Sequence, residues 1–395
     1  MLKASRYNHI IWRRNLPQLL YNSWHHRFLE LDNAQSAVYG GLSLPLTYNL
    51  INQKDPSVAK LVADLDKMEF LIDDNRDELK QIEVLSHLHR FDRSRLELWI
   101  NPTTRCDQNC PGCPYQDSRS DLTALGLEKI FRIISSRTPG LKQLSINWWG
   151  GQPALAWKMV LDFDKKLARL SQQFGFEYSY RTFGSGGGPA NRLAALSGKN
   201  ELYLNIESID LNNLPAAPVV LLGSIAGILK KFDKLPQGSR IRFIKNIPGE
   251  KFCRNVNHLC HSAPNLEDEE VGDINRLLEA GFTVENLPRP KLVSCQATDP
   301  QSFIIDAAGN SYRCWDDLGG PKKMLPEDTD DPMAPQNFRW LDWDPYHEAH
   351  CRMCNILPWC LGGCRARPPD ADCSQWHYAL REMLSLAAAA KKKGA

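Results

Sequence analysis

The segment LWINPTTRCDQNCPGCPYQ, residues 98–116, runs from an apolar stretch straight into three closely spaced cysteines. Cys106, Cys110 and Cys113 follow a Cys-x3-Cys-x2-Cys spacing. Thiolates are soft ligands that suit both iron–sulfur clusters and zinc. Structural zinc sites usually present paired Cys-x2-4-Cys arms, whereas here three thiols are crowded together. The spacing therefore favours an iron–sulfur cluster with three protein ligands, and zinc is the alternative.

A second segment, LSINWWGGQPAL (144–155), follows the cysteines at about the distance that one β/α unit requires. Gly150 and Gly151 have no Cβ, so the backbone can approach a ligand closely there. Taken alone, the segment is also consistent with a tight turn after a buried strand. Taken with the cysteines, it resembles the Gly-Gly-Glu-Pro motif of the radical SAM superfamily.

This resemblance implies a [4Fe-4S] cluster on Cys106, Cys110 and Cys113, with one iron left open for S-adenosylmethionine (SAM). It also implies reductive cleavage of SAM to a 5′-deoxyadenosyl radical, with electrons from a reductase such as flavodoxin or ferredoxin. Gln152 stands where the family usually has Glu, so it can accept a hydrogen bond from the SAM ammonium group without the charge-assisted part. The residue before the third cysteine is Gly rather than an aromatic residue, and Tyr115 is then expected to face the adenine.

The cysteines become dense again beyond residue 290. Cys295 and Cys314 come first, and a Cys-x2-Cys-x5-Cys-x3-Cys run and a last cysteine follow: Cys351, Cys354, Cys360, Cys364 and Cys373. The pattern resembles the seven-cysteine SPASM extension of radical SAM enzymes that modify peptides. The resemblance implies two auxiliary iron–sulfur clusters, one on Cys351, Cys354, Cys360 and Cys373, and one on Cys295, Cys314 and Cys364.

Two further features belong to this cysteine-rich region. FIIDAAGNSYRC (303–314) predicts a hairpin in which Gly309 permits the turn. The cluster on Cys295 lacks an obvious fourth ligand. Either Cys253 or Cys260 reaches back to it, or the cluster keeps an open site.

Composition excludes several classes of protein. The chain has 395 residues, 43% of them hydrophobic and 24% charged, which is ordinary for a soluble protein of two or three domains. A net charge of +2 carries no signature of nucleic-acid binding, and no apolar run is long enough to cross a membrane. Twelve cysteines without a signal peptide indicate metal binding in the reducing cytoplasm rather than disulfides.

The middle of the chain alternates strand-like and helical stretches. The strand-like runs between residues 96 and 290 are LELWI, KQLSIN, EYSYRTF, ELYLNIES, SRIRFIK and FTVENL. This alternation predicts an α/β fold with a parallel barrel, and the resemblance implies a partial (βα)6 TIM-like form. Functional groups are expected at the carboxyl ends of the strands. Glu207, Ser208 and Asp210 follow the fourth strand, where they either contact the SAM ribose or cap a helix.

The first 95 residues precede the cysteine triplet. We expect strands over 24–33 and 34–44, a helix over 44–52, a second helix that starts at Pro56 after Asp55, and a strand and a further helix over 70–91. These elements suggest a winged-helix-like module. Related maturases use such a module to hold the precursor peptide by adding a strand to a sheet edge. The alternative is a scaffold that caps the barrel.

The expected domains are this module over 1–95, a radical SAM core over 96–290, the SPASM region over 291–378, and a C-terminal helix with a frayed, solvated tail over 379–395. The favoured function is maturation of a ribosomally made peptide through a cross-link, such as a cyclophane or a thioether. One alternative is a dehydrogenase of the sulfatase-maturing type, whose relatives have Asp directly after the cysteine that corresponds to Cys314. Here Trp315 stands there, and Asp316 is the candidate proton acceptor. The other alternative is a non-catalytic, metal-stabilised peptide-binding protein.

Overall fold

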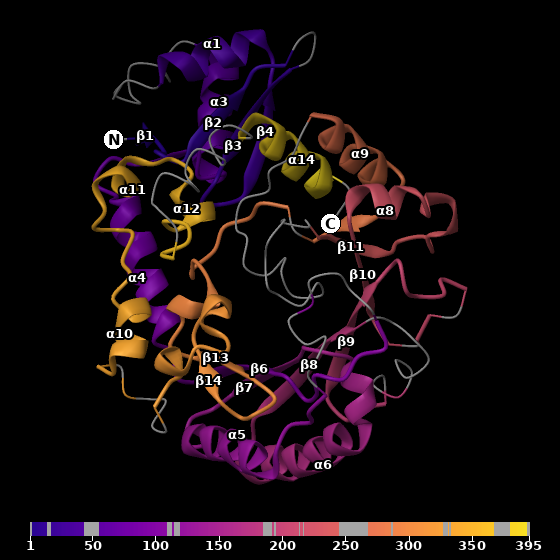
Figure 1. The fold of residues 1–395 in the computed structure, drawn as a ribbon. Helices are drawn as coiled ribbons and strands as arrows, with labels where there is room; N and C mark the ends of the chain where they lie inside the picture. The colour runs from indigo at the N-terminus through magenta and orange to yellow at the C-terminus, as the bar shows by residue number, and fades with distance from the viewer. Residues whose placement is uncertain are drawn as a thin grey trace.

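The computed structural model describes residues 2–13, 17–42, 55–108, 113, 119–184, 192, 195–212, 214–215, 217–244, 268–285, 287–326, 331, 333–366 and 380–392. Within these residues a nine-stranded sheet forms the centre of the molecule, in the order β12-β11-β10-β9-β8-β7-β6-β13-β14 (Figure 1). Strands β6 to β12 lie in chain order, and each pairs in parallel with the next. They are β6 (Arg95–Ile100), β7 (Gln143–Trp148), β8 (Glu177–Gly184), β9 (Lys199–Asn205), β10 (Val219–Gly223), β11 (Arg240–Phe243) and β12 (Thr283–Val284).

The six strand-like runs of the middle region are all present as strands, and the predicted parallel arrangement is confirmed. Strand β10 lies in the apolar run PVVLLGSIAGILKKF. Polar and apolar residues do not alternate in this run, so the sequence predicts a buried segment but not whether it is a strand or a helix. The described strands β12 and β14 stand at opposite ends of the order and do not pair with each other.

Helices cover one face of the parallel strands (Figure 1). They are α5 (Ala124–Arg137), α6 (Trp157–Phe174), α8 (Ile225–Leu229) and α9 (Asp268–Glu279), with the short 3-10 turns η1 (Pro153–Ala156) and η2 (Phe232–Lys234). Along β6, Leu96, Leu98 and Ile100 belong to the core beneath these helices. Trp99 points to the opposite, inner face and belongs to a second, aromatic-rich cluster. Successive side chains of β6 therefore point to opposite faces of the sheet, one toward the core beneath the helices and the other toward the aromatic-rich cluster.

The predicted hairpin is confirmed as β13 (Ser302–Ile305) and β14 (Ser311–Tyr312), which pair in antiparallel fashion. Its first strand also pairs in parallel with β6, so the hairpin extends the core sheet. Gly309 has φ +85°, and a Cβ there would lie 2.4 Å from the Cα of Gly126 at the start of α5. The turn thus needs glycine for its backbone angle and for close contact.

Beyond this hairpin, Cys351 lies in one short helix and Cys360 ends another. The elements of this region are η4 (Gln296–Thr298), η5 (Trp315–Asp317), η6 (Pro321–Lys323), α10 (Pro335–Leu341), α11 (Ala349–Met353) and α12 (Leu357–Cys360).

The N-terminal module contains a three-stranded antiparallel sheet of β2 (Asn8–Ile11), β3 (Gln18–Asn22) and β4 (Arg27–Leu31). A second small sheet joins β1 (Leu2–Ala4) to β5 (Leu71–Asp73). The helices of this module are α1 (Asn33–Gly41), α3 (Pro56–Lys67) and α4 (Glu78–Arg90).

Two predictions for this module have opposite outcomes. The helix start at Pro56 is confirmed, because Asp55 is the N-cap of α3. The strand expected over 34–44 is wrong, because α1 occupies Asn33–Gly41. Asp32 and Gln35 form a reciprocal capping box that satisfies backbone groups at the helix start. The helix expected over 44–52 lies outside the described residues.

The C-terminal helix α14 (Leu380–Lys392) packs against α9. Residues 387–390 were expected to belong to a frayed, solvated end. Instead, Ala387, Ala388 and Ala390 are buried in the main core with Leu384 and Leu386. Among the described residues, no helix combines the length and the apolar character that a bilayer span demands.

Candidate functional site

The Gly-Gly-Gln segment lies directly against the start of the cysteine loop. Backbone pairing between β6 and β7 continues beyond both strands, because the Gly151 N–H donates to the Thr103 carbonyl at 3.0 Å. The Gln152 N–H donates to the Arg105 carbonyl, the residue before Cys106, at 2.7 Å. The two sequence motifs are thus held in register by main-chain hydrogen bonds.

Both glycines are required by the space around them. Gly150 has φ +106°, and a Cβ there would lie 2.2 Å from the Asn101 side-chain oxygen. A Cβ on Gly151 would lie 2.1 Å from the backbone oxygen of Arg105. Gln152 is buried, and its side-chain oxygen reaches so close to Gly184 that a Cβ at Gly184 would lie 2.6 Å away. The close contacts of both glycines are with the base of the cysteine loop, and their approach to a ligand stays a prediction.

The cysteine loop is closed at its base by residues on either side of it. Thr103 forms an antiparallel bridge with Asp121, and Arg105 makes an ion pair with the same aspartate at 2.8 Å. The Thr104 N–H donates to the Ser120 carbonyl at 2.8 Å, and the Ser120 N–H donates to the Thr104 hydroxyl at 2.8 Å. The segment between Arg105 and Ser120 therefore begins and ends at one point, above the end of β6.

Two of the three expected cluster ligands can be placed. Cys106 is exposed and Cys113 is partly buried, whereas Cys110 and Tyr115 lie outside the described residues. The buried Nδ2 of Asn101, next to Gly150, has no hydrogen-bond partner among the described residues. Accessible thiols, a glycine cradle and a donor free to bind a ligand together fit a cluster with SAM.

The other candidates near this site are engaged differently. Ser208 lies just after β9, where its hydroxyl donates to the Asn205 carbonyl at 3.2 Å within a turn. Asp316 is exposed. Its neighbour Asp317 is buried and contacts Arg339, Lys323 at 3.3 Å and the Trp340 indole N–H at 3.1 Å.

An aromatic layer covers the inner face of the sheet, and the sequence analysis did not identify it. Trp99 and Trp149 both contact Trp315, with ring centroids 5.5 Å and 4.7 Å apart. Phe183 stacks on Tyr203 at 4.6 Å and contacts Trp99 at 5.4 Å. Since Trp149 precedes Gly150 and Trp315 follows Cys314, the layer connects the two cysteine regions. The alternation of side chains along β6 could have shown that Trp99 faces away from Leu98 and Ile100. No sequence signal predicts the contact between Trp99 and Trp315.

The C-terminal cysteines divide into two neighbourhoods. Cys295 and Cys314 share a small cluster with Ala297 and Trp340. Burial strongly raises the pKa of the Cys314 thiol. Cys351 and Cys354 pack with the residues around α12, the helix that ends at Cys360.

This division follows the two ligand sets that the resemblance implies. Cys364 is partly buried, and Cys373 lies outside the described residues, as do Cys253 and Cys260. Within the described part of the chain, no three His, Cys, Asp or Glu side chains converge closely enough to hold a metal ion.

The N-terminal module contacts the loop that carries these cysteines. The Ser23 hydroxyl donates to the carbonyl of Asn355, next to Cys354, at 2.7 Å, and His9 Nε2 lies 3.1 Å from the same oxygen. The Trp359 indole N–H donates to the Tyr21 hydroxyl at 3.0 Å. The module therefore supports the backbone between two expected cluster ligands.

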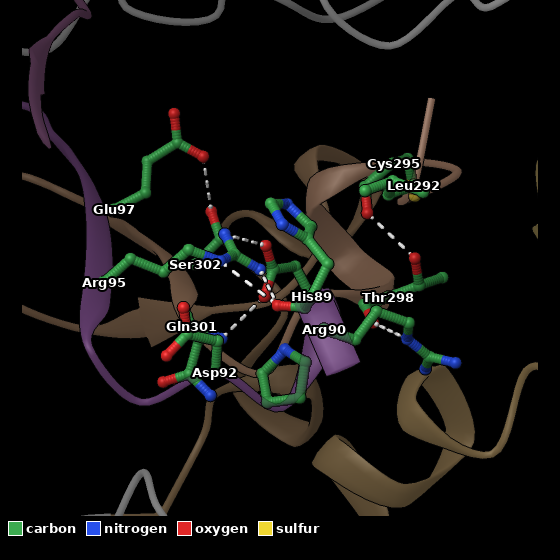
Figure 2. Close-up of polar contacts among 12 residues, drawn as sticks. His89, Arg90, Asp92, Arg95, Glu97, Leu292, Cys295, Thr298, Gln301 and Ser302 are labelled. Atoms are coloured by element: carbon green, nitrogen blue, oxygen red, sulfur yellow. Dashed lines mark hydrogen bonds and ion pairs between the residues drawn. The ribbon is translucent and has the colours of Figure 1, made fainter. Parts of the chain in front are cut away.

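Helix α4 makes a second set of contacts, at the other cysteine neighbourhood. Figure 2 shows Thr298 between Cys295 and Arg90: its hydroxyl donates to the Cys295 carbonyl at 2.9 Å, and its carbonyl accepts from Arg90 Nε at 3.0 Å. Nearby, Arg95 forms an ion pair with Asp299 at 2.8 Å.

Comparison with known proteins finds similarity among solved structures. No family model matches the chain, and no curated protein does. SuiB from Streptococcus suis has a TM-score of 0.44 at 15% identity, covering 92% of this chain and 95% of that chain. The enzyme anSMEcpe, solved with bound AdoMet and a Cp18Cys peptide, has a TM-score of 0.47 at 17% identity, covering 74% of this chain and 99% of that chain. SuiB has also been solved with its precursor peptide SuiA, and that structure has a TM-score of 0.42 at 16% identity. Similarity at this level leaves the function to be argued from the residues of the site.

Proposed function

We propose that this chain is a radical SAM enzyme with a SPASM extension that modifies a ribosomally made peptide. The observation that carries the proposal is the joining of the two SAM motifs by backbone hydrogen bonds from Gly151 and Gln152 to the residues before Cys106. A structural zinc site needs thiols but gives no reason for a glycine pair packed against the base of the cysteine loop.

In this proposal Cys106, Cys110 and Cys113 hold a [4Fe-4S] cluster, and Gly150, Gly151 and Gln152 border the bound SAM. The cluster and SAM would supply the one-electron cleavage that produces a 5′-deoxyadenosyl radical. The chain's own contribution is to orient these groups and to exclude water. The layer of Trp99, Trp149 and Trp315 suits the second task, since all three indoles are buried on the inner face beside both cysteine regions.

The proposed peptide partner is supported by the N-terminal sheet. Strand β4 is at one end of the order β2-β3-β4, so it has an edge without a strand neighbour among the described residues. An extended leader segment could add there as a fourth strand, with main-chain hydrogen bonds as the source of affinity. The same module contacts Asn355 through Ser23 and Trp359 through Tyr21, which supports the proposal that a leader bound to this module lies on the side of the proposed auxiliary clusters.

We further propose that the product is a cross-link, such as a cyclophane or thioether ring, and that an auxiliary cluster accepts the surplus electron. A dehydrogenase of the sulfatase-maturing type is the second candidate. It needs a proton acceptor after Cys314. Trp315 packs into the aromatic layer at that position, Asp316 is exposed, and Asp317 is already paired with Arg339. These contacts favour cross-link formation over the dehydrogenase.

The deciding experiment uses anaerobically reconstituted protein, dithionite and SAM, with 5′-deoxyadenosine measured by chromatography and iron and sulfide measured in parallel. We expect 5′-deoxyadenosine and roughly 11–12 iron atoms per chain, the content of three cysteine-ligated clusters. Zinc without sulfide, and no 5′-deoxyadenosine, would replace the proposal with a non-catalytic peptide-binding protein.

A further inference from the structure

Arg242 points to the inner face of the sheet. It lies on β11 directly opposite Leu222 of β10, and side chains opposite each other in neighbouring strands share a face. Leu222 belongs to the inner aromatic-rich cluster, and so does Ile244, two residues after Arg242. The guanidinium therefore stands on the same side as the tryptophan layer.

The strand registers place Arg242 at the height of the glycine pair. Arg242 pairs with Leu222, and Leu222 pairs with Asn205 of β9. Leu204, the residue before Asn205, pairs with Gly184 of β8, so Asn205 lies one residue closer to the carboxyl ends of the strands than Gly184 does. Trp148 pairs with Thr182, so Gly184 is level with Gly150. Arg242 therefore stands level with Gly151, at the carboxyl ends of the strands.

The charge of Arg242 is poorly compensated within the described part of the chain. Its Nε is buried without a hydrogen-bond partner there, and burial lowers the pKa of the guanidinium. Arg181 and Arg289 add repulsion, whereas Glu285 and Tyr203 attract it only at a distance. Arg242 is partly buried as a residue, but its Nε is enclosed, and a cation held there without a direct partner carries a desolvation cost that an incoming anion would relieve.

The nearby carboxylates of this face are already used. Arg240, two residues earlier on the same strand and face, pairs with both Glu201 and Glu285. Arg181 pairs with Glu97 at 3.6 Å. The contrast between two arginines on one strand is therefore informative: Arg240 has two carboxylate partners, and Arg242 has none among the described residues.

We propose that Arg242 binds a carboxylate of the peptide substrate, either an Asp or Glu side chain or the peptide C-terminus. This inference depends on the function proposed above and names a feature of its substrate. The carboxylate of SAM is a poor candidate, because the cysteine loop and Gly150 follow β6 and β7, and β11 lies four strands from β7. Four strand spacings amount to roughly 19 Å along the sheet.

The test uses two pools of synthetic random octapeptides, one with free C-termini and one with amidated C-termini. Reconstituted protein with SAM is immobilised, and the retained peptides are sequenced by mass spectrometry. We expect the wild type to favour acidic peptides by about tenfold to hundredfold, the range of a charge-assisted hydrogen bond. Enrichment of Asp or Glu in both pools identifies a side chain, and preference for the free pool identifies the C-terminus.

Variants assign this preference to Arg242. Arg242→Met should abolish it, Arg242→Glu should replace it with a preference for Lys and Arg, and Arg242→Lys should keep part of it if the site tolerates the shorter reach. Arg240→Lys is the matched control on the same strand and should bind as the wild type does. Circular dichroism melting confirms that each variant is folded. If Arg242→Met unfolds, the test relies on Arg242→Lys and Arg242→Glu, because both keep a charged side chain at this position.

Equal acidic preference in the wild type and in folded variants without the positive charge would overturn the inference, as would the absence of any preference in the wild type. Loss of SAM binding in Arg242→Met, with peptide preference intact, would assign the arginine to SAM and also overturn it. Failure of this inference can be distinguished from failure of the proposed function. If the proposed function is wrong, the wild-type protein forms no 5′-deoxyadenosine, whatever peptides it binds.

Discussion

The two cysteine regions of this chain differ in how the fold treats their thiols. Cys106 is exposed in the loop above β6, and Cys113 is only partly buried. Cys314, Cys351 and Cys360 are buried within packed clusters. Thiolates that bind metal must be deprotonated, and burial without metal opposes this by raising the pKa, as at Cys314.

The difference teaches that the same ligand type can serve two purposes. An exposed thiol such as Cys106 leaves a cluster open to a small molecule, and its loss removes little packing. Cys360 is buried in the main core and Cys351 in a smaller cluster, so a metal bound by them would contribute to folding itself. The loop is expected to govern chemistry, and the C-terminal cysteines are expected to govern stability.

The largest expected effect is on chemistry. Replacing Cys106, Cys110 and Cys113 together by Ala should abolish 5′-deoxyadenosine formation and remove about four iron atoms per chain. The urea midpoint should stay near the wild-type value, because Cys106 is exposed and Cys113 is only partly buried. Met333→Ala, at an exposed residue outside both expected ligand sets, is the control. Continued SAM cleavage in the triple variant would contradict the assignment of the loop.

The second effect is on stability. Cys360→Ala should lower the free energy of unfolding by an amount on the order of 3 kcal/mol, because it removes a buried ligand and the metal bound there. The measurement is urea denaturation under anaerobic conditions, with Cys106→Ala as the matched variant. The comparison between the two regions fails if both variants lose the same stability.

A third change tests the contact between the two SAM motifs. Gly151→Ala places a Cβ 2.1 Å from the Arg105 carbonyl, so the base of the cysteine loop must move. We expect SAM to bind about tenfold to hundredfold more weakly by isothermal titration calorimetry, as a displaced site loses oriented contacts. Gly272→Ala on α9, where a Cβ meets nothing within 4 Å, is the control. Unchanged SAM affinity in Gly151→Ala would show that the segment does not border the ligand.

The smallest effect concerns the residue that departs from the family pattern. Gln152→Glu adds a carboxylate that can pair with the SAM ammonium group, and the desolvation of a buried charge offsets part of the gain. We expect about threefold to tenfold tighter SAM binding in the same calorimetric assay. Gln152→Ala should bind more weakly than the wild type. Weaker binding by the Glu variant would mean that this side chain faces another group.

Local signals in the sequence account for much of the fold. Alternating apolar residues predict six of the seven described strands β6 to β12, and Asp55 with Pro56 predicts the start of α3. Where the apolar residues of a segment follow no helical or strand period, as in β10, the sequence does not predict whether the segment is a helix or a strand. For 34–44, β-prone residues favour a strand, but the capping box of Asp32 and Gln35 starts a helix instead.

The candidate site divides in the same way. Cysteine spacing and the glycine pair predict the SAM motifs, because these features are local, and the structure tests only their contact with each other. The aromatic layer and Arg242 depend on strand register and on side-chain direction across distant strands. Trp315 and Trp149 are neighbours only because β13 pairs with β6, and no pattern along the chain predicts that pairing.

Strand β13 also determines how this chain could be divided or recombined. It completes the edge of the core by pairing with β6, and Gly309 in its hairpin leaves no room for a Cβ beside Gly126. A chain cut at residue 290 would expose the hydrogen-bonding edge of β6, which is a template for aggregation. Exchange of C-terminal regions between relatives would therefore succeed only when the hairpin and the first turn of α5 are transferred together.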